Sequence, residues 1–420
     1  MSIDLPLKGS FTLDTSGVMG FFGGEEALSA MATVHLYRGR HWLGWYNSPG
    51  SYTVAKKFGQ LAKSRIWDGI FPGSSVTPEE MFGLDGKEGP RFIGVFSGTD
   101  MTVTGHLAYL TAQKAKETEY QNVLRGRITT PGSVSIIDVD NVELKQGDNV
   151  PTVKVFHALY AAIPITSSLA ACLTCAFIRD WFAFGMILLG MVSSGLSCYV
   201  IGSGKLHFKL VKPSSYAPRG DGFLLTHSDI VILKGAEKEV TSITKGQLAL
   251  DMGNNHDEEF NAIGICSLLL LSQFLTQLLL VPQATLFGQI MFLSSLAVSW
   301  AYNSFLSSLE NEKIQTDILW NSLNSPLITK SVLPNRTSQA AYAYFKPTKI
   351  LEYMIPNDTR VWEVWRAHVA KQVLSKGRIR DFGLCQELIT DLEDEEQQLL
   401  TQLLADAEYG YGCYQNISNP

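Results

Sequence analysis

The stretch FNAIGICSLLLLSQFLTQLLLVPQATLFGQIMFLSSLAVSWAYNSFLSSL, residues 260–309, decides the fold class, because its fifty residues include no Asp, Glu, Lys, Arg or His. A second apolar block runs from Leu159 to Gly204, and its charged residues are the adjacent Arg179 and Asp180. A bilayer core of about 30 Å is crossed by about 20 apolar residues in a helix. Each block is long enough for two spans and a tight turn, so the sequence predicts four transmembrane helices arranged as two hairpins.

The spans are expected at about 159–178, 181–203, 261–281 and 285–305, with turns at Arg179–Asp180–Trp181 and Val281–Pro282–Gln283. Small residues recur at every fourth position of the first two spans. They are Ser167, Ala171 and Cys175 on the first, and Gly190, Ser194 and Cys198 on the second. Small residues at this spacing let helix backbones approach closely. We therefore expect these two faces to pack against each other.

We expect an α+β membrane protein of five parts. They are a mixed α/β N-terminal cytosolic region (1–157), transmembrane hairpin 1 (158–204), a strand-rich cytosolic insert (205–259), transmembrane hairpin 2 (260–305) and a helical tail with an acidic end (306–420). Alternating apolar residues indicate strands near 91–98, 101–112 and 133–144, the last with a bulge at Ile136–Ile137. Helical spacing indicates a basic amphipathic helix over 51–67, one helix after the Asn357–Asp358–Thr359 cap and an acidic one near 385–407.

Charge is distributed unevenly along the chain, although the formal net charge is only −6. Basic residues flank the outer ends of the predicted hairpins at Lys145, Lys154, Lys205, Lys209, Lys212 and Arg219, whereas the two turns contain only Arg179. Because cytosolic loops carry the excess of Lys and Arg, we expect an integral, multi-pass protein of an endomembrane or the plasma membrane with both termini cytosolic. Acceptor triplets for N-glycosylation at Asn335, Asn357 and Asn416 would favour the opposite orientation if they are used.

The segment 27–67 combines six cations, no acid and many aromatic residues. Cations attract an anionic leaflet by about 1 kcal/mol each, and aromatic rings settle at headgroup depth. The lipid-binding candidates are Arg38, Arg40, Trp42, Trp45, Lys56, Lys57, Lys63 and Arg65. We expect membrane lipids as partners, a protein partner for the acidic C-terminal helix, and no nucleic acid, because a membrane-tethered chain has no further basic domain. A solvated basic face with ordinary core aromatics is the alternative, and a homo-oligomer is left open.

Catalytic signatures are sparse. His35, His41 and His106 are the candidates for acid–base chemistry, but none has the spacing of a metal ligand set. The glycines Gly17, Gly20, Gly23 and Gly24 lack the Gly-Lys-Ser/Thr that follows in a phosphate-binding loop. We therefore expect no metal and no cofactor. The lack of acids and bases within the spans argues against ion-coupled transport.

At FGQIMFLSSLAVSWAYNSFLSSLE (287–310) and GDGFLLTHSDIVILKG (220–235) the chain resembles uncharacterised multi-spanning membrane proteins of mushroom-forming fungi. The resemblance covers mainly residues 150–320. It implies a eukaryotic membrane protein and carries over no functional residue.

The sequence favours a non-enzymatic scaffold, accessory or sensor protein that presents cytosolic domains at a membrane surface. A membrane-bound enzyme that acts on a lipid-soluble substrate, with its site in residues 1–157, is the alternative. An oligomeric pore is the third interpretation.

Overall fold

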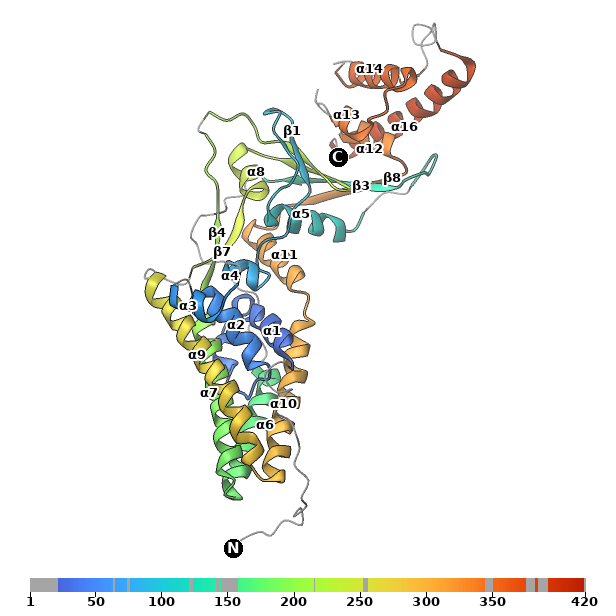
Figure 1. The fold of residues 1–420 in the computed structure, drawn as a ribbon. Helices are drawn as coiled ribbons and strands as arrows, with labels where there is room; N and C mark the ends of the chain where they lie inside the picture. Colours follow the sequence, from blue (N-terminus) through green and yellow to red (C-terminus); the bar gives the residue numbers. More distant parts are fainter. Residues whose placement is uncertain are drawn as a thin grey trace. The chain divides into compact units, whose positions relative to one another are not determined.

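The structure is a computed structural model that describes residues 22–62, 65–73, 76–120, 124–140, 144, 158–214, 216–251, 256–343, 350–374, 382–383 and 392–418. The chain forms two compact units (Figure 1). Unit 1 comprises Met1–Gly86, Gly147–Phe208 and Leu248–Ile318, and unit 2 comprises Lys87–Gln146, Lys209–Gln247 and Leu319–Pro420. Each unit is described by itself.

Long helices occupy all four predicted spans in unit 1. They are α6 (Ala158–Phe177), α7 (Trp181–Gly202), α9 (His256–Leu280) and α10 (Leu286–Ser307). A short 3-10 turn, η2 (Val281–Gln283), joins α9 to α10 where the Val-Pro-Gln turn was predicted. Pro164 lies inside α6. The helices form one bundle in which α7 packs against α6 and α9, and α10 packs against α6 and α7.

Three of these helices, not four, are long and apolar enough to cross a membrane among the residues that the structure describes. They are Leu159–Phe177, Trp181–Gly202 and Asn261–Gln283. The fourth predicted span, α10, is not among them, because Gln289, Tyr302 and Asn303 interrupt its apolar sequence. All three side chains are buried, so the polar face of α10 is directed into the unit.

Shorter elements complete unit 1. They are α1 (Gly24–Leu36), η1 (Arg40–Leu43), α2 (Ser51–Leu61), α3 (Arg65–Ile70), α4 (Pro78–Met81) and most of α11 (Asn311–Ser322), with most of the two-stranded pair β4 (Lys205–Lys209) and β7 (Gln247–Asp251). Helix α1 packs along α10 and α2 packs along α9. The single basic helix predicted over 51–67 is two helices in the structure, because α2 ends at Leu61 and α3 begins at Arg65.

Unit 2 is built on a six-stranded sheet of order β2-β1-β5-β6-β3-β8. The strands are β1 (Arg91–Gly94), β2 (Asp100–Met101), β3 (Gly132–Asp138), β5 (Gly222–Leu225), β6 (Ile230–Lys234) and β8 (Ile328–Leu333). Strands β3 and β6 pair in parallel and the other neighbours are antiparallel.

Two strand predictions need correction. The register from Val134↔Ile230 to Asp138↔Lys234 is unbroken, so β3 has no bulge; its two adjacent isoleucines are both buried because β3 is a central strand. The run 101–112 does not form a strand over its length, because helix α5 (His106–Glu117) begins inside it. Its apolar residues Leu107 and Leu110 lie one helical turn apart and are buried, a spacing that fits a helix as well as a strand.

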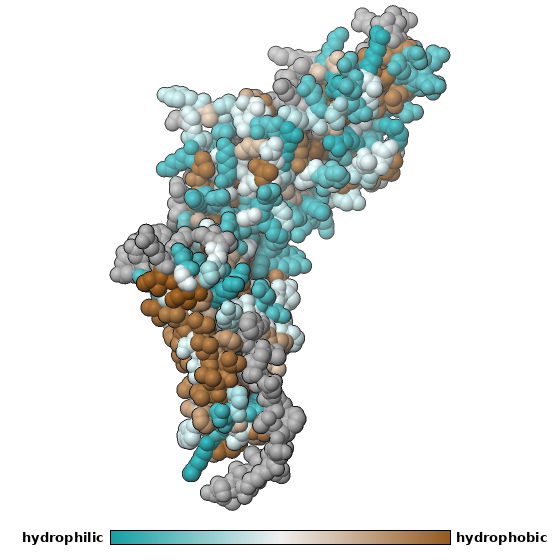
Figure 2. Space-filling model, in the orientation of Figure 1, coloured by the Kyte–Doolittle hydropathy of each residue, from teal (hydrophilic) through white to brown (hydrophobic). Residues whose placement is uncertain are grey.

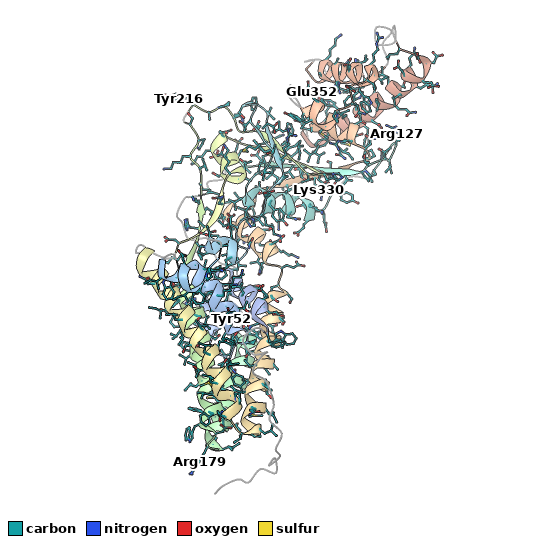
Figure 3. All side chains as sticks on the ribbon, viewed as in Figure 1. Tyr52, Arg127, Arg179, Tyr216, Lys330 and Glu352 are labelled. Atoms are coloured by element: carbon teal, nitrogen blue, oxygen red, sulfur yellow. The ribbon has the colours of Figure 1, made fainter. Side chains whose placement is uncertain are left out.

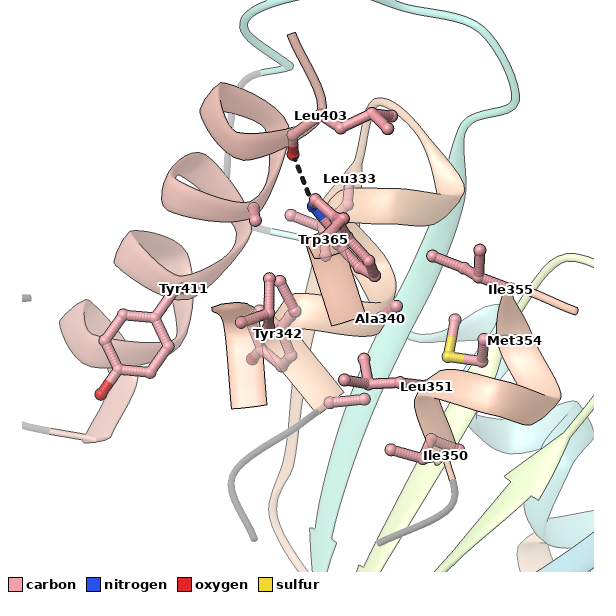
Figure 4. Packing of buried hydrophobic residues seen from close by; sticks show 14 of the residues in the cluster. Leu333, Ala340, Tyr342, Ile350, Leu351, Met354, Ile355, Trp365, Leu403 and Tyr411 are labelled. Carbon is pink, nitrogen blue, oxygen red and sulfur yellow. Dashed lines mark hydrogen bonds between the residues drawn. The ribbon is translucent and has the colours of Figure 1, made fainter. Parts of the chain in front are cut away.

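Helices α8 (Glu237–Thr244), α12 (Arg336–Ala343), α13 (Ile350–Met354), α14 (Arg360–Leu374) and α16 (Asp394–Ser418) complete unit 2. Figure 4 shows the core that α12, α14 and α16 share, in which Trp365 Nε1 donates to Leu403 O at 3.0 Å. The helix predicted after Asn357–Asp358–Thr359 is confirmed as α14. The acidic helix predicted at 385–407 is found at Asp394–Ser418, and residues 385–391 lie outside the described residues.

Candidate functional site

The residues between α1 and α2 enter the interior of the unit 1 bundle. Arg40 is 1 % exposed, Tyr46 2 % and Asn47 0 %. Glycines make room for them on α7. A Cβ at Gly190 would lie 2.0 Å from Asn47 Oδ1, and a Cβ at Gly195 would lie 2.3 Å from the ring of Trp45. We call residues 40–48 the inserted segment.

This packing corrects one expectation about α7. Its small residues Gly190, Ser194 and Cys198 were expected to face α6, but Gly190 meets Asn47, and Cys198 lies against Gly44. On α6, Ala171 and Cys175 do pack toward the first part of α7, beside Ala183 and Ile187. The stripe on α7 therefore receives the inserted segment, and the part of α7 near the turn packs against α6.

Hydrogen bonds tie the inserted segment to two long helices. The Asn47 backbone N–H donates to Ser168 Oγ on α6 at 3.1 Å, and Asn47 Nδ2 donates to Ser295 Oγ on α10 at 2.9 Å. The Tyr46 hydroxyl donates to Asn303 Oδ1 on α10 at 2.7 Å, and Asn303 Nδ2 donates to Ser48 Oγ at 3.2 Å. Because a buried polar group without a partner costs several kcal/mol in an apolar interior, these bonds fix the position of the segment.

Arg40 brings a positive charge into the same interior. Its Nη1 donates to Cys198 Sγ on α7 at 3.8 Å, and its guanidinium lies 5.5 Å from the centre of the Tyr302 ring on α10. Arg40 is also hydrogen-bonded to the Tyr46 hydroxyl. The rings of Tyr46 and Tyr302 meet edge to face at 5.5 Å. An arginine stays charged in proteins, so Arg40 is a buried cation surrounded by aromatic and polar groups. We call Arg40 and these groups the buried cation site. It links α7 and α10 through the inserted segment.

The flanking helices extend these contacts to α9 and α10. On α2, the Ala55 carbonyl accepts from Ser267 Oγ of α9 at 2.6 Å, and the Tyr52 ring lies 5.3 Å from that of Phe274. Tyr52 is labelled within the bundle in Figure 3. On α1, Glu26 accepts from Trp300 Nε1 of α10 at 3.4 Å. The segment 24–61 thus contacts every long helix of the unit.

The lipid-binding candidates are divided by this arrangement. Arg40 was expected at the surface among the lipid-binding candidates, but its side chain is buried in the interior of unit 1. Arg38, Trp42 and Lys56 are exposed, and Trp45 and Lys57 are half-buried. Lys63 lies outside the described residues, and Arg65 is described only as the first residue of α3. The three exposed side chains remain available to a partner.

The histidine candidates do not form one site. His35 is buried beside Phe82, and burial lowers its pKa to about 4, with a smaller contribution from His41 in the same direction. His41 lies half-buried between Trp42 and Tyr199, and burial also lowers its pKa. His106 begins α5 in unit 2, where it is buried and stacks on Tyr109. These positions fit structural histidines.

Sequence reasoning missed Asn47, Ser295 and Asn303 as members of a site. The available signal was the presence of glycine on two segments, Gly44 on one and Gly190 and Gly195 on the other, because close approach needs small residues on one or both sides.

Among the described residues, no group of three or more His, Cys, Asp and Glu side chains could hold a metal ion. Comparison with protein-family models, with curated proteins and with solved structures finds no match for this chain.

Proposed function

We propose that the chain is an integral membrane scaffold or sensor, in which unit 1 is embedded in a bilayer and unit 2 is presented at its surface. The proposal rests on where polar and apolar side chains lie in unit 1: large apolar side chains lie on the outside of the long helices and polar side chains lie inside. Large apolar side chains are exposed on the long helices: Leu159 is 79 % exposed, Phe177 87 % and Leu279 68 %. Figure 2 shows such side chains gathered along α9. The buried positions of the same helices hold Ser168, Ser267, Gln273, Gln277, Ser295 and Asn303.

Such an exterior is costly in water and favourable in lipid. Exposed apolar surface contributes about 25 cal/mol per Å² when it leaves water, and a soluble chain rarely exposes a large continuous patch. Lipid also rewards polar groups that bond between helices, as Gln277 Nε2 does with Met186 O at 3.4 Å.

Helix α10 crosses the bilayer in this proposal, together with the three more apolar helices. Its buried face, with Gln289, Ser299 and Asn303, is turned inward, and α1 packs along it. Helix α1 is itself rich in buried Ala, Leu and Val. A polar helix face that is covered by protein does not contact lipid. The mean hydropathy of α10 therefore underestimates how well this helix fits into a membrane.

We place both termini in the cytosol. Lys205 and Lys209 follow α7, whereas Arg179, at the turn between α6 and α7, is the basic residue of the two hairpin turns (Figure 3).

The acceptor triplets for N-glycosylation favour the opposite orientation, but the structure weakens the case for the triplet at Asn335. Asn335 is buried, and its amide donates to Arg127 O at 3.0 Å and accepts from Ser338 N–H at 2.9 Å, so it is engaged as the cap of α12.

Scaffolding is favoured over a pore or an enzyme because side chains of the inserted segment fill the interior of the bundle. Asn47 and Trp45 occupy the space beside Gly190 and Gly195, and Asn47 bonds to Ser168 and Ser295. The acidic start of α16 supplies a surface for a basic protein partner. Glu393, Asp394 and Glu395 are exposed there, while Leu400, Leu403 and Leu404 are buried in the core.

Membrane integration is tested by alkaline carbonate extraction of membranes from cells that express the full chain. We expect the protein to remain in the membrane pellet and to require detergent for release. Recovery of folded protein in the carbonate supernatant would contradict the proposal.

Orientation is tested in a eukaryotic host through Asn357, which is exposed in unit 2. We expect no glycosidase-sensitive mass shift for the native chain or for Asn357→Gln. A positive control carries a long Gly/Ser spacer with an acceptor triplet between Pro282 and Gln283, both exposed at the second turn, and should be glycosylated. A shift in the native chain that is lost in Asn357→Gln would reverse the orientation.

A further inference from the structure

Unit 2 contains a hollow of about 440 Å³ at the turn between β5 and β6. The polar residues of its lining are Thr129, Thr130, Thr226, His227, Ser228, Asp229, Arg336 and Gln339. These residues come from three separate stretches, namely the approach to β3, the β5–β6 turn and the start of α12. The volume falls within the range of about 300–1,000 Å³ that is usual for small-molecule sites.

The wall of the hollow is held by the protein itself. In the turn, Thr226 Oγ1 donates to Asp229 O at 2.8 Å and accepts from the Asp229 N–H at 3.0 Å. The Asp229 carboxylate accepts from the backbone N–H and the hydroxyl of Ser133, at 2.8 and 2.7 Å, and from Ser228 Oγ at 3.1 Å. A turn fixed in this way presents its remaining groups in constant positions.

The carboxylate of Asp229 accepts hydrogen bonds from these donors within the wall. Burial alone would raise the pKa of Asp229, but the hydrogen bonds from Ser133 and Ser228 and the charge of Lys330 outweigh it, so the pKa lies below its usual value. Asp229 therefore remains an anion whose carboxylate accepts hydrogen bonds within the wall.

Arg336 supplies the positive charge of the hollow. Its Nε donates to the Met354 carbonyl oxygen at 2.5 Å, which fixes one edge of the guanidinium, and the side chain remains exposed. Arginine offers a planar fork of donors that matches a phosphate group in two bonds. His227 is exposed on the β5–β6 turn and adds a ring N–H donor to the lining.

A second hollow of about 570 Å³ shares the Thr226–Asp229 turn, but its lining differs in charge. It includes both Glu88 and Lys116. Both hollows share Asp229, but this one adds the acid Glu88 and has no arginine in its lining. The hollow that contains Arg336 is therefore the better candidate for a phosphate-bearing ligand.

We propose that the hollow lined by Arg336, His227 and the surrounding threonine and serine hydroxyls binds a phosphorylated polyol. The phosphate group pairs with Arg336 and His227. The polyol hydroxyls exchange hydrogen bonds with Thr129 and Thr130 and donate to the hydroxyl oxygens of Thr226 and Ser228, whose own protons are used within the turn. The ligand chemistry is the same whether the polyol phosphate is free in solution or is the headgroup of a lipid. The site lies within unit 2 and does not depend on how unit 1 is embedded.

The test uses the full chain in detergent and inositol 1,4,5-trisphosphate as the probe, with binding measured by titration calorimetry. We expect Arg336→Gln and His227→Ala each to weaken binding, by about tenfold or more for Arg336→Gln, because a charged two-bond contact is lost. Arg125→Gln, an exposed arginine of unit 2 outside the lining, should leave binding unchanged. The circular dichroism spectrum of each variant checks its fold, and His227→Ala keeps the test valid if Arg336→Gln fails to fold.

Two further binding measurements distinguish recognition of the polyol from recognition of phosphate alone, and a lipid headgroup from a soluble ligand. Inorganic phosphate should bind much more weakly than the polyol phosphate; equal affinity would contradict recognition of the polyol. Vesicles that contain phosphatidylinositol 4-phosphate should bind the protein in an Arg336-dependent way if the source is a lipid headgroup, and only the free polyol phosphate should bind if the source is soluble. Absence of binding to every phosphorylated polyol probe, or binding that neither variant reduces, would overturn the proposal.

Discussion

Asp180 Oδ2 accepts two hydrogen bonds from Thr285, one from its hydroxyl at 2.6 Å and one from its backbone N–H at 2.8 Å. Asp180 ends the turn between α6 and α7, where its other oxygen accepts from Ala183 N–H at 3.1 Å, and Thr285 caps the start of α10. Asp180 is buried. One carboxylate therefore joins the turns of both helical hairpins and caps α7.

This relationship predicts coupling between the two turns. Asp180→Asn and Thr285→Val should each lower the free energy of unfolding by about 1–3 kcal/mol, because charge-assisted bonds are lost. The double variant should be less destabilised than the sum of the two, with a coupling energy of about 0.5 kcal/mol or more. Thermal unfolding in detergent measures all three.

Arg179→Asn is the matched control, because Arg179 is exposed and adopts a positive φ of 66° that Asn tolerates. It should leave the unfolding temperature nearly unchanged. Strict additivity of Asp180→Asn and Thr285→Val would show that the two turns act independently.

A second prediction concerns the close approach of α7 and the inserted segment. Gly190→Ala should destabilise unit 1 by about 1–3 kcal/mol, because the added methyl group would overlap Asn47 Oδ1, which is fixed through Ser295. Gly185→Ala on the same helix meets nothing within 4 Å and should be neutral or slightly stabilising. Equal unfolding temperatures for the two variants would contradict the packing of Asn47 on α7.

The four long helices could be predicted from the sequence because long stretches rich in apolar residues and nearly free of charge identify a buried or lipid-facing helix without reference to its partners. Their ends were also predictable. Asp180 caps α7, and Thr285 caps α10 beyond the Val-Pro-Gln turn, so local chemistry fixes both turns.

The burial of the inserted segment could not be predicted in the same way. Arg40, Trp45 and Tyr46 have the composition of a membrane-surface segment, and their burial depends on contacts with Cys198, Gly195 and Asn303, which are more than a hundred residues away in the chain. Composition describes what a segment can contact, whereas tertiary packing decides what it does contact. The lining of the unit 2 hollow has the same origin, because Thr226 and Arg336 are brought together by the fold.

A third prediction separates Arg40 from Arg38. Arg40→Ala should lower the free energy of unfolding by about 2 kcal/mol or more, because it removes buried side-chain packing and the donor to Tyr46. Arg38→Ala should change it by less than about 0.5 kcal/mol, since Arg38 is exposed. Binding to anionic vesicles should be reduced more by Arg38→Ala than by Arg40→Ala, and Arg38→Ala should bind them more weakly than the native chain does. If Arg40→Ala were as stable as Arg38→Ala, the buried cation site would be dispensable.

The last prediction concerns acid pH and the pair of Arg91 and Asp100 in unit 2. Arg91 donates to both carboxylate oxygens of Asp100, at 2.9 and 2.6 Å, and the Tyr353 hydroxyl donates to the same group at 2.9 Å. Hydrogen bonding from Arg91, followed by that from Tyr353, lowers the pKa of Asp100 from 3.8 to about 2. The pair joins β1 to β2 and to α13.

Because the folded pKa lies below the unfolded value, the unfolded chain binds more protons between these two pH values. The stabilisation from Asp100 is thus complete above pH 3.8 and is lost as the pH falls toward about 2. Hydrogen exchange of peptides covering 91–101, compared at each pH between the native chain and Asp100→Asn, should show native protection that exceeds the variant's at pH 5 and converges with it near pH 2. Glu117→Gln, an exposed acid of the same unit, should follow the native curve. A constant difference between native and Asp100→Asn over this range would contradict the assigned role of the carboxylate charge.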